Sequence, residues 1–126
     1  MPDGDFCMYT IRVEADFAAA HFLSRYRGKC ERLHGHNYKV RAYASGSSLG
    51  PGGMLIDFGE LKLALRSVLE ALDHSLLNDL PEFDNDPSAE RIAEYIYKAV
   101  AKRLPEAPLR AIEVFETETS MARYEA

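Results

Sequence analysis

Histidines are the residues of this chain whose types and spacing could carry chemistry. His34 and His36 are one residue apart, and His21 lies shortly before them. Three imidazoles are a ligand set of catalytic zinc sites, which keep a fourth position open. Three neutral ligands also leave the ion the charge that polarises a bound hydroxyl or carbonyl. We therefore predict a catalytic zinc site at His21, His34 and His36, although a His-x-His pair can also be an ordinary feature of a strand.

Cys30 lies four residues before His34. A nearby cation lowers the pKa of a thiol and favours the thiolate that a base or nucleophile requires. Two alternatives stay open, because Cys30 could instead be a fourth zinc ligand that closes the site, or a small buried apolar residue. The other cysteine is Cys7, and the acidic N-terminus shows no signal peptide. We expect two free thiols in a cytoplasmic protein.

Two further positions carry groups suited to proton transfer or ligand binding. Asp73 and His74 are a suitable pair for orienting an imidazole and moving a proton, although such a pair at a helix end can be a simple capping charge. Glu116 follows the alternation of Ile112 and Val114, which places its carboxylate in line with core residues. A carboxylate there needs a partner, and a ligand with adjacent N–H groups would serve.

Composition limits the possible partners. The chain has 126 residues, of which 28% are charged, and a net charge of −5. This is typical of a globular chain, and we expect a single domain over residues 1–126. No global basic field favours nucleic acid as a partner, and no apolar run is long enough to span a membrane. A local basic cluster interrupts the acidic background, and a solvated loop is its simplest interpretation: Arg25, Arg27, Lys29 and Arg32.

Hydrophobic periodicity predicts the elements that must position these groups. Residues 8–18 alternate as a half-buried strand, and a second strand from His36 places His34, His36 and Tyr38 on one face. A helix opens with Asp57 as its cap and an apolar face that begins at Phe58. A second helix begins at residues 86–87 with proline at its first position, and strands follow at residues 111–117 and 120–125. The predicted class is α+β, in the order ββααββ.

Several short motifs occur together and in order along the chain. They are Ala19-Ala20-His21, Cys30-x-x-x-His34-Gly35-His36, Asp57-Phe58-x-x-Leu61-Lys62, Leu72-Asp73-His74-x-x-Leu77-Asn78, Pro87-Ser88-x-Glu90 and Glu116-Thr117. In this combination the chain resembles the 6-pyruvoyl-tetrahydropterin synthase / 6-carboxytetrahydropterin synthase family. The likeness covers nearly the whole chain, from His21 to Thr117.

The resemblance implies a tunnelling fold (T-fold), with a four-stranded antiparallel sheet carrying two helices on one face. It implies a homohexamer, a dimer of trimers, with active sites between subunits. It assigns zinc to the three histidines, removal of a carbon-bound proton to Cys30, and proton shuttling to Asp73 and His74, from a neighbouring subunit. The implied substrate-binding residues are Glu116, which anchors the pterin ring, with Thr117 and Glu90. Charge alone makes the basic loop a candidate for the triphosphate: Arg25, Arg27, Lys29 and Arg32.

The implied substrate is 7,8-dihydroneopterin triphosphate, and the enzyme a lyase that eliminates triphosphate. The compact motif around Cys30 is similar to the 6-carboxytetrahydropterin synthases, which release acetaldehyde and serve queuosine (7-deazaguanine) synthesis. The 6-pyruvoyl-tetrahydropterin branch is an alternative. Glu31 indicates a second alternative, since some relatives use a glutamate in this loop to cleave the dihydropterin side chain for folate. A zinc- or pterin-binding module without catalysis is the outside hypothesis.

Overall fold

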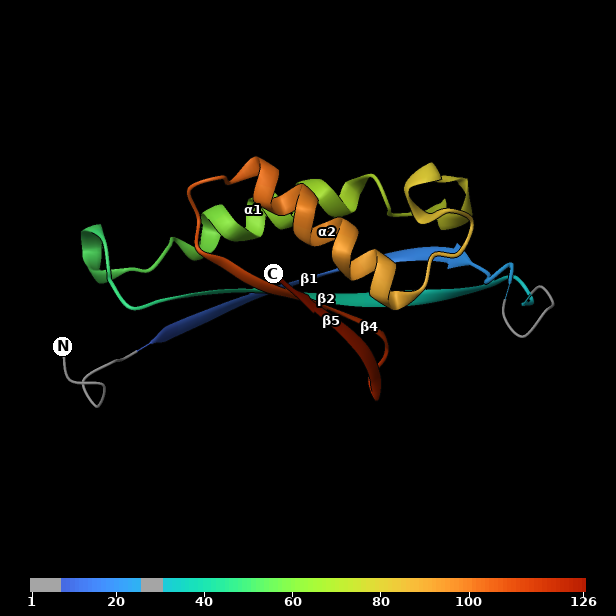
Figure 1. Ribbon diagram of the computed structural model, residues 1–126, viewed down its shortest axis with the longest axis horizontal. Helices are drawn as coiled ribbons and strands as arrows, with labels where there is room; N and C mark the ends of the chain where they lie inside the picture. Colours follow the sequence, from blue (N-terminus) through green and yellow to red (C-terminus); the bar gives the residue numbers. More distant parts are fainter. Residues whose placement is uncertain (1–7, 26–30) are drawn as a thin grey trace.

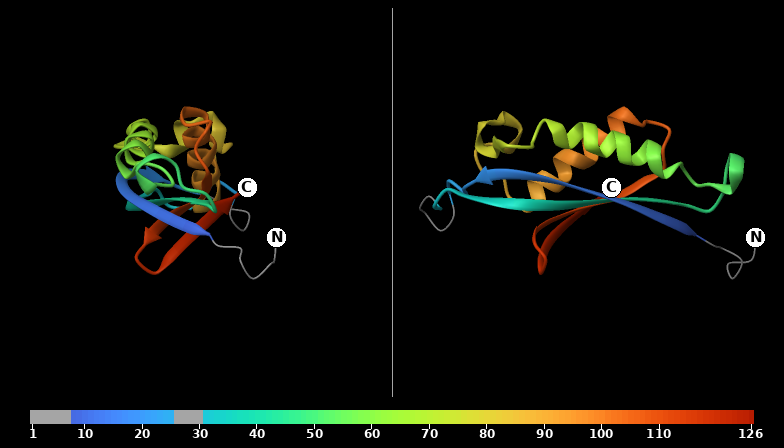
Figure 2. Two further views of the ribbon diagram at one scale, coloured as in Figure 1. Left: turned by 90° about the vertical axis from the view of Figure 1, so that its left-hand side faces the viewer. Right: turned by 180° about the vertical axis from the view of Figure 1, so that it is seen from behind.

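A computed structural model of the protein describes residues 8–25 and 31–126. A twisted sheet forms one layer, and two helices, α1 and α2, lie together on one of its faces (Figures 1 and 2). The other face of the sheet carries no described helix. This confirms the expected two-layer α+β arrangement, in which a sheet buries one face against helices.

The sheet is built around two long antiparallel strands. β1 (Tyr9–His21) pairs with β2 (His34–Gly46) in an unbroken register, which places His21 opposite His34. β4 (Leu109–Thr117) adds to β2, and β5 (Ser120–Glu125) adds to β4, both antiparallel. Both long strands extend further toward the histidines than the sequence pattern indicates, because pairing continues past the end of the clear alternation.

The expected count of four strands is wrong by one short element. β3 (Ser75–Leu76) pairs parallel with Ala19 and Ala20, so that the order across the sheet is β3-β1-β2-β4-β5. Two residues are too few to show any alternation in a sequence. The short strand matters to the site, because it places the preceding residues, Asp73 and His74, beside β1.

α1 (Phe58–Glu70) begins as expected at Asp57, whose Oδ1 accepts a hydrogen bond from the backbone N–H of Gly59 at 2.9 Å. The helix buries its apolar face, with one exception. Phe58 is 58% exposed and does not belong to the core, which corrects the expectation for that residue. As the first residue of the helix, it precedes the turn that first packs on the sheet. The buried residues of α1 are Leu61, Ala64, Leu65, Val68 and Leu69.

α2 (Ala89–Arg103) starts later than the sequence predicts. Its N-cap is Ser88, whose Oγ accepts from the backbone N–H of Arg91 at 3.2 Å. Pro87 therefore lies before the cap and not at the first helical position. A serine side chain that caps the helix fixes the boundary more strongly than the preference of proline for the first turn.

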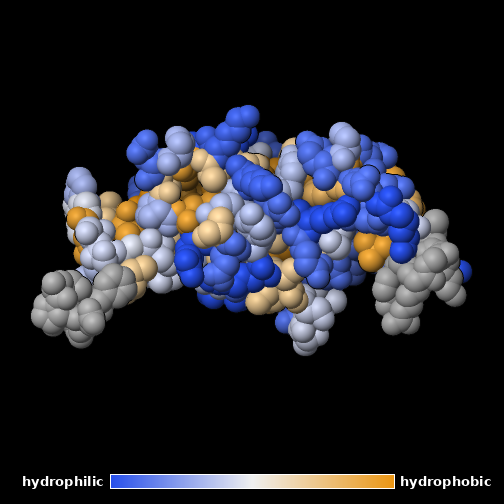
Figure 3. Space-filling view, in the orientation of Figure 1, coloured by the Kyte–Doolittle hydropathy of each residue, from blue (hydrophilic) through white to orange (hydrophobic). Residues whose placement is uncertain are grey.

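The core lies between the sheet and the two helices. Its largest fully buried members are Tyr38, Phe83, Leu61, Leu65 and Leu72. The visible face in Figure 3 is mainly hydrophilic, with small apolar patches between the charged side chains. Within the described residues, no helix is long and apolar enough to cross a membrane.

Candidate functional site

The three predicted histidines converge at one end of the sheet. His21 is the last residue of β1, while His34 and His36 are the first and third residues of β2. The Nε2 atoms of His21 and His34 are 3.1 Å apart, and one ring nitrogen from each of the three residues lies within 4.8 Å of the others. Strand register and the i, i+2 spacing together produce this convergence.

Backbone carbonyls fix the tautomers of two of these imidazoles. His21 donates from Nδ1 to the carbonyl of Pro87 at 2.9 Å, and His34 donates from Nδ1 to the carbonyl of Arg32 at 2.7 Å. A carbonyl oxygen only accepts, so each Nδ1 holds the proton and each neutral ring directs a lone pair from Nε2. The two lone pairs then face one another, an arrangement that a cation between them stabilises.

The geometry fits a metal ion. Zn–N distances of about 2.0–2.1 Å in a tetrahedral site place two ligand nitrogens about 3.3 Å apart, and the two Nε2 atoms are 3.1 Å apart. The Nε2 of His36 is buried and has no hydrogen-bond partner within the described residues. Burial lowers the pKa of His36, which favours the neutral form that binds metals. The cluster can therefore bind a metal ion, and backbone carbonyls fix the orientation of two of its three rings.

Glu116 lies beside the cluster. Its Oε2 is 3.7 Å from Nε2 of His21, and its side chain remains 30% exposed. It lines a hollow of about 400 Å³ together with Tyr38 and Thr117. A carboxylate on the rim of a hollow can accept hydrogen bonds from a bound molecule. Glu90 is exposed on the first turn of α2, and the structure gives it no contact with the histidines.

Asp73 and His74 form a hydrogen-bonded pair after α1. His74 Nδ1 and Asp73 Oδ2 are 2.9 Å apart, and Asp73 Oδ1 accepts from the backbone N–H of Ala18 at 2.9 Å. That backbone bond, followed by the contact with His74, lowers the pKa of Asp73. The His74 side chain is 83% exposed on a backbone with φ of 56°. It lines a groove of about 480 Å³ together with His36, but no hydrogen bond joins it to the three histidines.

The predicted basic loop is only partly described. Cys30, Arg27 and Lys29 lie outside the described residues. Arg25 is described, and its guanidinium contacts both Asp84 and Asp86, at 3.1 and 2.6 Å. Two carboxylates already neutralise it, which favours a structural role over the expected contact with triphosphate.

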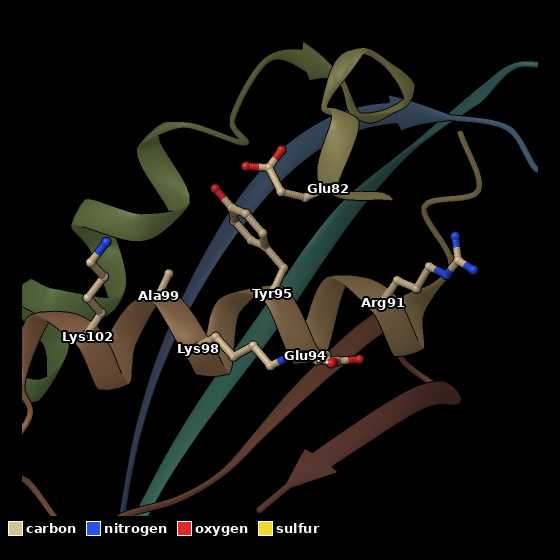
Figure 4. A pocket seen from close by; sticks show the side chains of 7 residues that line it. All are labelled: Glu82, Arg91, Glu94, Tyr95, Lys98, Ala99 and Lys102. Carbon is tan, nitrogen blue, oxygen red and sulfur yellow. Dashed lines mark hydrogen bonds and ion pairs between the residues drawn. The ribbon is translucent and has the colours of Figure 1, made fainter. Parts of the chain in front are cut away.

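A second hollow lies away from the histidines, against the outer side of α2 (Figure 4). It is lined by Glu82, Arg91, Glu94, Tyr95, Lys98, Ala99 and Lys102. Two of its charges satisfy each other, since Lys98 Nζ and Glu94 Oε2 are 2.6 Å apart. None of the predicted site residues that the structure describes lines it, so we place the candidate site at the histidines.

Comparison with known proteins identifies the family of the chain. Residues 10–126 match the family described as 6-pyruvoyl tetrahydropterin synthase. The chain belongs to this family of pterin synthases. A 6-carboxy-5,6,7,8-tetrahydropterin synthase from Synechocystis is 40% identical over 93% of both chains. The 6-pyruvoyl tetrahydrobiopterin synthase of Homo sapiens is 32% identical over 96% of this chain and 94% of the human protein. The solved structure of Caenorhabditis elegans 6-pyruvoyl tetrahydropterin synthase superposes with a TM-score of 0.82, at 26% identity over 96% of this chain and 97% of that one.

Sequence reasoning missed the groups of this pterin synthase that orient the histidines. They are the backbone carbonyls of Pro87 and Arg32, and a main-chain oxygen has no signature in residue types. It also missed Tyr38 as a neighbour of the cluster, although its parity with His36 was the available signal. The Tyr38 ring lies edge-on to His21 and His36, at centroid distances of 5.8 and 5.3 Å.

Proposed function

We propose that this pterin synthase is a zinc-dependent 6-carboxytetrahydropterin synthase of the cytoplasm. It would convert 7,8-dihydroneopterin triphosphate to 6-carboxy-5,6,7,8-tetrahydropterin, with loss of acetaldehyde and triphosphate, for queuosine synthesis. The observation that carries the metal part is the 3.1 Å approach of two Nε2 atoms whose Nδ1 protons are already bound. The choice of branch is supported by the 40% identity to the Synechocystis protein of that name, over 93% of each chain.

Zinc is the proposed ion because imidazoles with one coordination position left open are typical of its catalytic sites. Held by His21, His34 and His36, it would supply a Lewis acid toward the hydroxyls of the substrate side chain. The protein's own contribution is to orient the rings of His21 and His34 through carbonyl contacts, and to favour the neutral form of His36 by burial.

Glu116 and Thr117 are the proposed contacts of the pterin ring. A carboxylate accepts from adjacent N–H groups, and Glu116 borders both the histidines and the hollow of about 400 Å³. Glu90 is a further candidate for the substrate, from the first turn of α2. Because Arg25 is already paired, we assign the triphosphate to the remaining basic residues of its loop, Arg27, Lys29 and Arg32.

Cys30, Asp73 and His74 are the proposed proton-transfer groups. Cys30 as a thiolate would remove the carbon-bound proton, and a cation close by favours that thiolate. The Asp73 carboxylate accepts from His74 and from a backbone N–H, so the pair is fixed and ready to hold or move a proton. Its exposure in one chain supports a role in the site of a neighbouring copy.

We propose that the protein works as a homo-oligomer, a dimer of trimers. Two edges of the sheet support this. β5 forms one edge, and the first residues of β1, before Ala19, pair with no described strand on their outer side. Unpaired edges are templates for pairing with another chain. Joining β1 of one copy to β5 of the next would close such sheets into a ring.

One observation favours a second candidate reaction. The backbone N–H of Glu31 donates to the carbonyl of Leu23 at 2.8 Å, and its Oε1 accepts from the N–H of Leu23 at 3.1 Å. Its negative charge acts on both His36 and Tyr38, which places it near the cluster. A fixed carboxylate there could serve as a base in cleavage of the side chain to a hydroxymethyl-dihydropterin. The 6-pyruvoyl branch stays a further alternative through the human relative.

Product analysis tests the proposal. Purified, zinc-loaded protein is given 7,8-dihydroneopterin triphosphate, and the products are identified by mass spectrometry. A carboxy-tetrahydropterin with acetaldehyde is the expected result. A 6-pyruvoyl or hydroxymethyl product would move the protein to another branch. Bound zinc without any product would leave a binding module.

A further inference from the structure

The carboxylate of Asp86 collects donors from the segment that follows His21. Its Oδ1 accepts from the backbone N–H of Ser24 at 2.6 Å and from the Ser24 hydroxyl at 3.0 Å. The same oxygen accepts from the backbone N–H of Arg25 at 3.3 Å, and Oδ2 accepts from Arg25 Nε at 2.7 Å. Only 18% of the Asp86 side chain is exposed. We call Ser24, Arg25 and Asp86 the Asp86 clamp.

The next residue along the chain acts on the metal cluster directly. The carbonyl of Pro87 accepts the Nδ1–H of His21 at 2.9 Å, and so selects the tautomer that directs Nε2 toward His34. Residues 86–87 therefore make two contacts: Pro87 binds the ring of His21, and Asp86 binds the backbone of Ser24 and Arg25, shortly after His21. A displacement of this segment would move the carbonyl away from the imidazole.

The segment around Asp86 is also fixed from its other side. Arg91, labelled in Figure 4, donates from Nη1 to the carbonyl of Phe83 at 2.7 Å. Asn78 Nδ2 donates to the carbonyl of Asn85 at 3.1 Å, while the N–H of Ser88 donates to the carbonyl of Asp86 at 2.9 Å. The turn before α2 is therefore a rigid support against which the clamp can act.

We propose that Arg25 and Asp86 are positioning residues of the metal site, and that Arg25 does not bind the substrate triphosphate. The clamp joins the segment after His21 to the turn that holds its Nδ1 proton, and so keeps Nε2 directed at the ion. The inference rests on the proposed function only in taking a metal ion as the ligand. It assigns no role in the chemical steps to either residue.

The exposure of the charged groups indicates which contact matters. Asp84 also pairs with Arg25, but the two side chains are 75% and 60% exposed. Exposed ion pairs contribute little, because water screens them. Asp86 differs in accepting two backbone N–H groups, which lose this acceptor if its carboxylate is removed. Asp84→Ala is thus a matched control for Asp86→Ala.

The test measures Zn²⁺ affinity by competition with a chromophoric chelator, without any substrate. Asp86→Ala is expected to weaken binding about tenfold, the lower end for loss of an outer-shell partner. It is also expected to shift the visible absorption bands of the Co²⁺-loaded protein, which report ligand geometry. Asp84→Ala should match the wild type in both. Arg25→Ala should reproduce part of the Asp86→Ala effect, and the double variant should add little to it.

An unchanged Zn²⁺ affinity and Co²⁺ spectrum in Asp86→Ala would overturn the proposal. So would an Arg25→Ala variant that raises only the KM for the triphosphate substrate, with metal affinity intact. If Asp86→Ala does not fold, the milder Ser24→Ala is measured in the same way. If the wild type binds no zinc, the proposed function fails, but the clamp can still be tested by NMR of the metal-free protein. The exchange-protected Nδ1–H signal of His21 should then disappear in Asp86→Ala and persist in Asp84→Ala.

Discussion

Two regions of the molecule bury polar side chains, and they differ in whether the buried polar atoms have hydrogen-bond partners. On the helix-free face, Glu113 is 7% exposed and both of its oxygens are used. Tyr43 donates to one at 2.7 Å, and Arg123 donates to the other at 2.9 Å. We call these three residues the Glu113 network. At the histidine cluster, the Nδ1 atoms of His21 and His34 bind backbone carbonyls, and their Nε2 atoms lie 3.1 Å apart, where neutral rings have no proton to donate.

This difference in hydrogen bonding distinguishes a buried network with a structural role from a cluster that could bind a ligand. A buried polar group with all its partners stabilises a fold and needs nothing else. Nitrogen lone pairs that face one another with no proton or cation between them repel, so the rest of the structure must hold them in place. A ligand that binds between them would explain such an arrangement. Side chains of the same chain complete the Glu113 network, whereas the histidine cluster could be completed by a metal ion.

The largest expected effect is at the histidine cluster. His34→Ala should weaken Zn²⁺ binding by more than about a hundredfold, because even outer-shell partners of metal ligands are worth ten- to a hundredfold. Pterin synthase activity should be lost with it. Stability of the metal-free variant should not fall, since the unfavourable Nε2 contact with His21 is removed. Calorimetric Zn²⁺ titration and thermal unfolding with and without Zn²⁺ measure both.

Zn²⁺ at about a hundred times its Kd should stabilise the wild type by about 2.7 kcal/mol. The same addition should leave His34→Ala unchanged. His74→Ala is the control, because that residue makes no hydrogen bond to the three histidines and should keep normal metal affinity. A His34→Ala variant that still gains stability from Zn²⁺ would place the metal elsewhere.

The Glu113 network should show the reverse pattern. Glu113→Ala removes the acceptor of the Tyr43 hydroxyl and of Arg123 Nη1, while Arg123 Nε keeps its contact with Glu125 at 3.2 Å. The loss of these two partly buried hydrogen bonds should lower the free energy of unfolding by about 2 kcal/mol. Its Zn²⁺ affinity should equal that of the wild type. Urea unfolding and the same calorimetric titration check the two values. A parallel loss of Zn²⁺ affinity would show that the two regions are coupled.

Acid pH should lower the free energy of unfolding through Asp86, which lies close to the histidine cluster. Burial alone raises the pKa of Asp86, but hydrogen bonds from Ser24 and Arg25 outweigh it and hold this pKa below its ordinary value of 3.8. On acidification the unfolded chain therefore takes up this proton before the folded protein does. The stabilisation is complete above about pH 5 and is lost as the pH falls below the unfolded-state value, through the folded-state pKa.

The measurement is urea unfolding of metal-free wild type and Asp86→Asn over a series of pH values. The difference between their free energies of unfolding should be constant near neutral pH and shrink toward acid. A difference that does not change with pH would mean that the ionised form of Asp86 contributes nothing to the clamp.

The sequence predicted the fold well where local rules decide the structure. The alternation of β1 and β2, the cap at Asp57 and the parity of His34 with His36 are local patterns, and all are confirmed. The convergence of His21 with His34 needed only the assumption that two successive strands pair as neighbours.

Features that depend on contacts distant in the sequence escaped prediction. The acceptors of Arg25 lie 59 and 61 residues further along the chain, so the residue appeared to be a free basic group. The Pro87 carbonyl has no sequence signal, and its role follows only from the delayed start of α2, which begins after the Ser88 cap. The Glu113 network arises from three strands whose order no local pattern records.

The smallest expected effect compares two tyrosines, one in each region. Tyr38 is fully buried, and its ring stacks on that of Phe17 with the centroids 4.8 Å apart. Its hydroxyl has no hydrogen-bond partner within the described residues. Burial, with the nearby charges of Glu116 and Glu31, raises its pKa, so the hydroxyl stays neutral. Tyr38→Phe should leave the free energy of unfolding unchanged or raise it by about 1 kcal/mol, because a buried hydroxyl without a hydrogen bond is unfavourable.

Tyr43→Phe removes a hydroxyl that donates to Glu113 and should lower the free energy of unfolding by about 1 kcal/mol. Urea unfolding of the two metal-free variants is therefore expected to give opposite signs for the same chemical change. A Tyr38→Phe variant that is destabilised like Tyr43→Phe would mean that the hydroxyl has a structural partner. A variant of normal stability that turns over more slowly would assign the Tyr38 hydroxyl to the site, with a bound molecule as its partner, because the loss would appear only when the histidine cluster is in use.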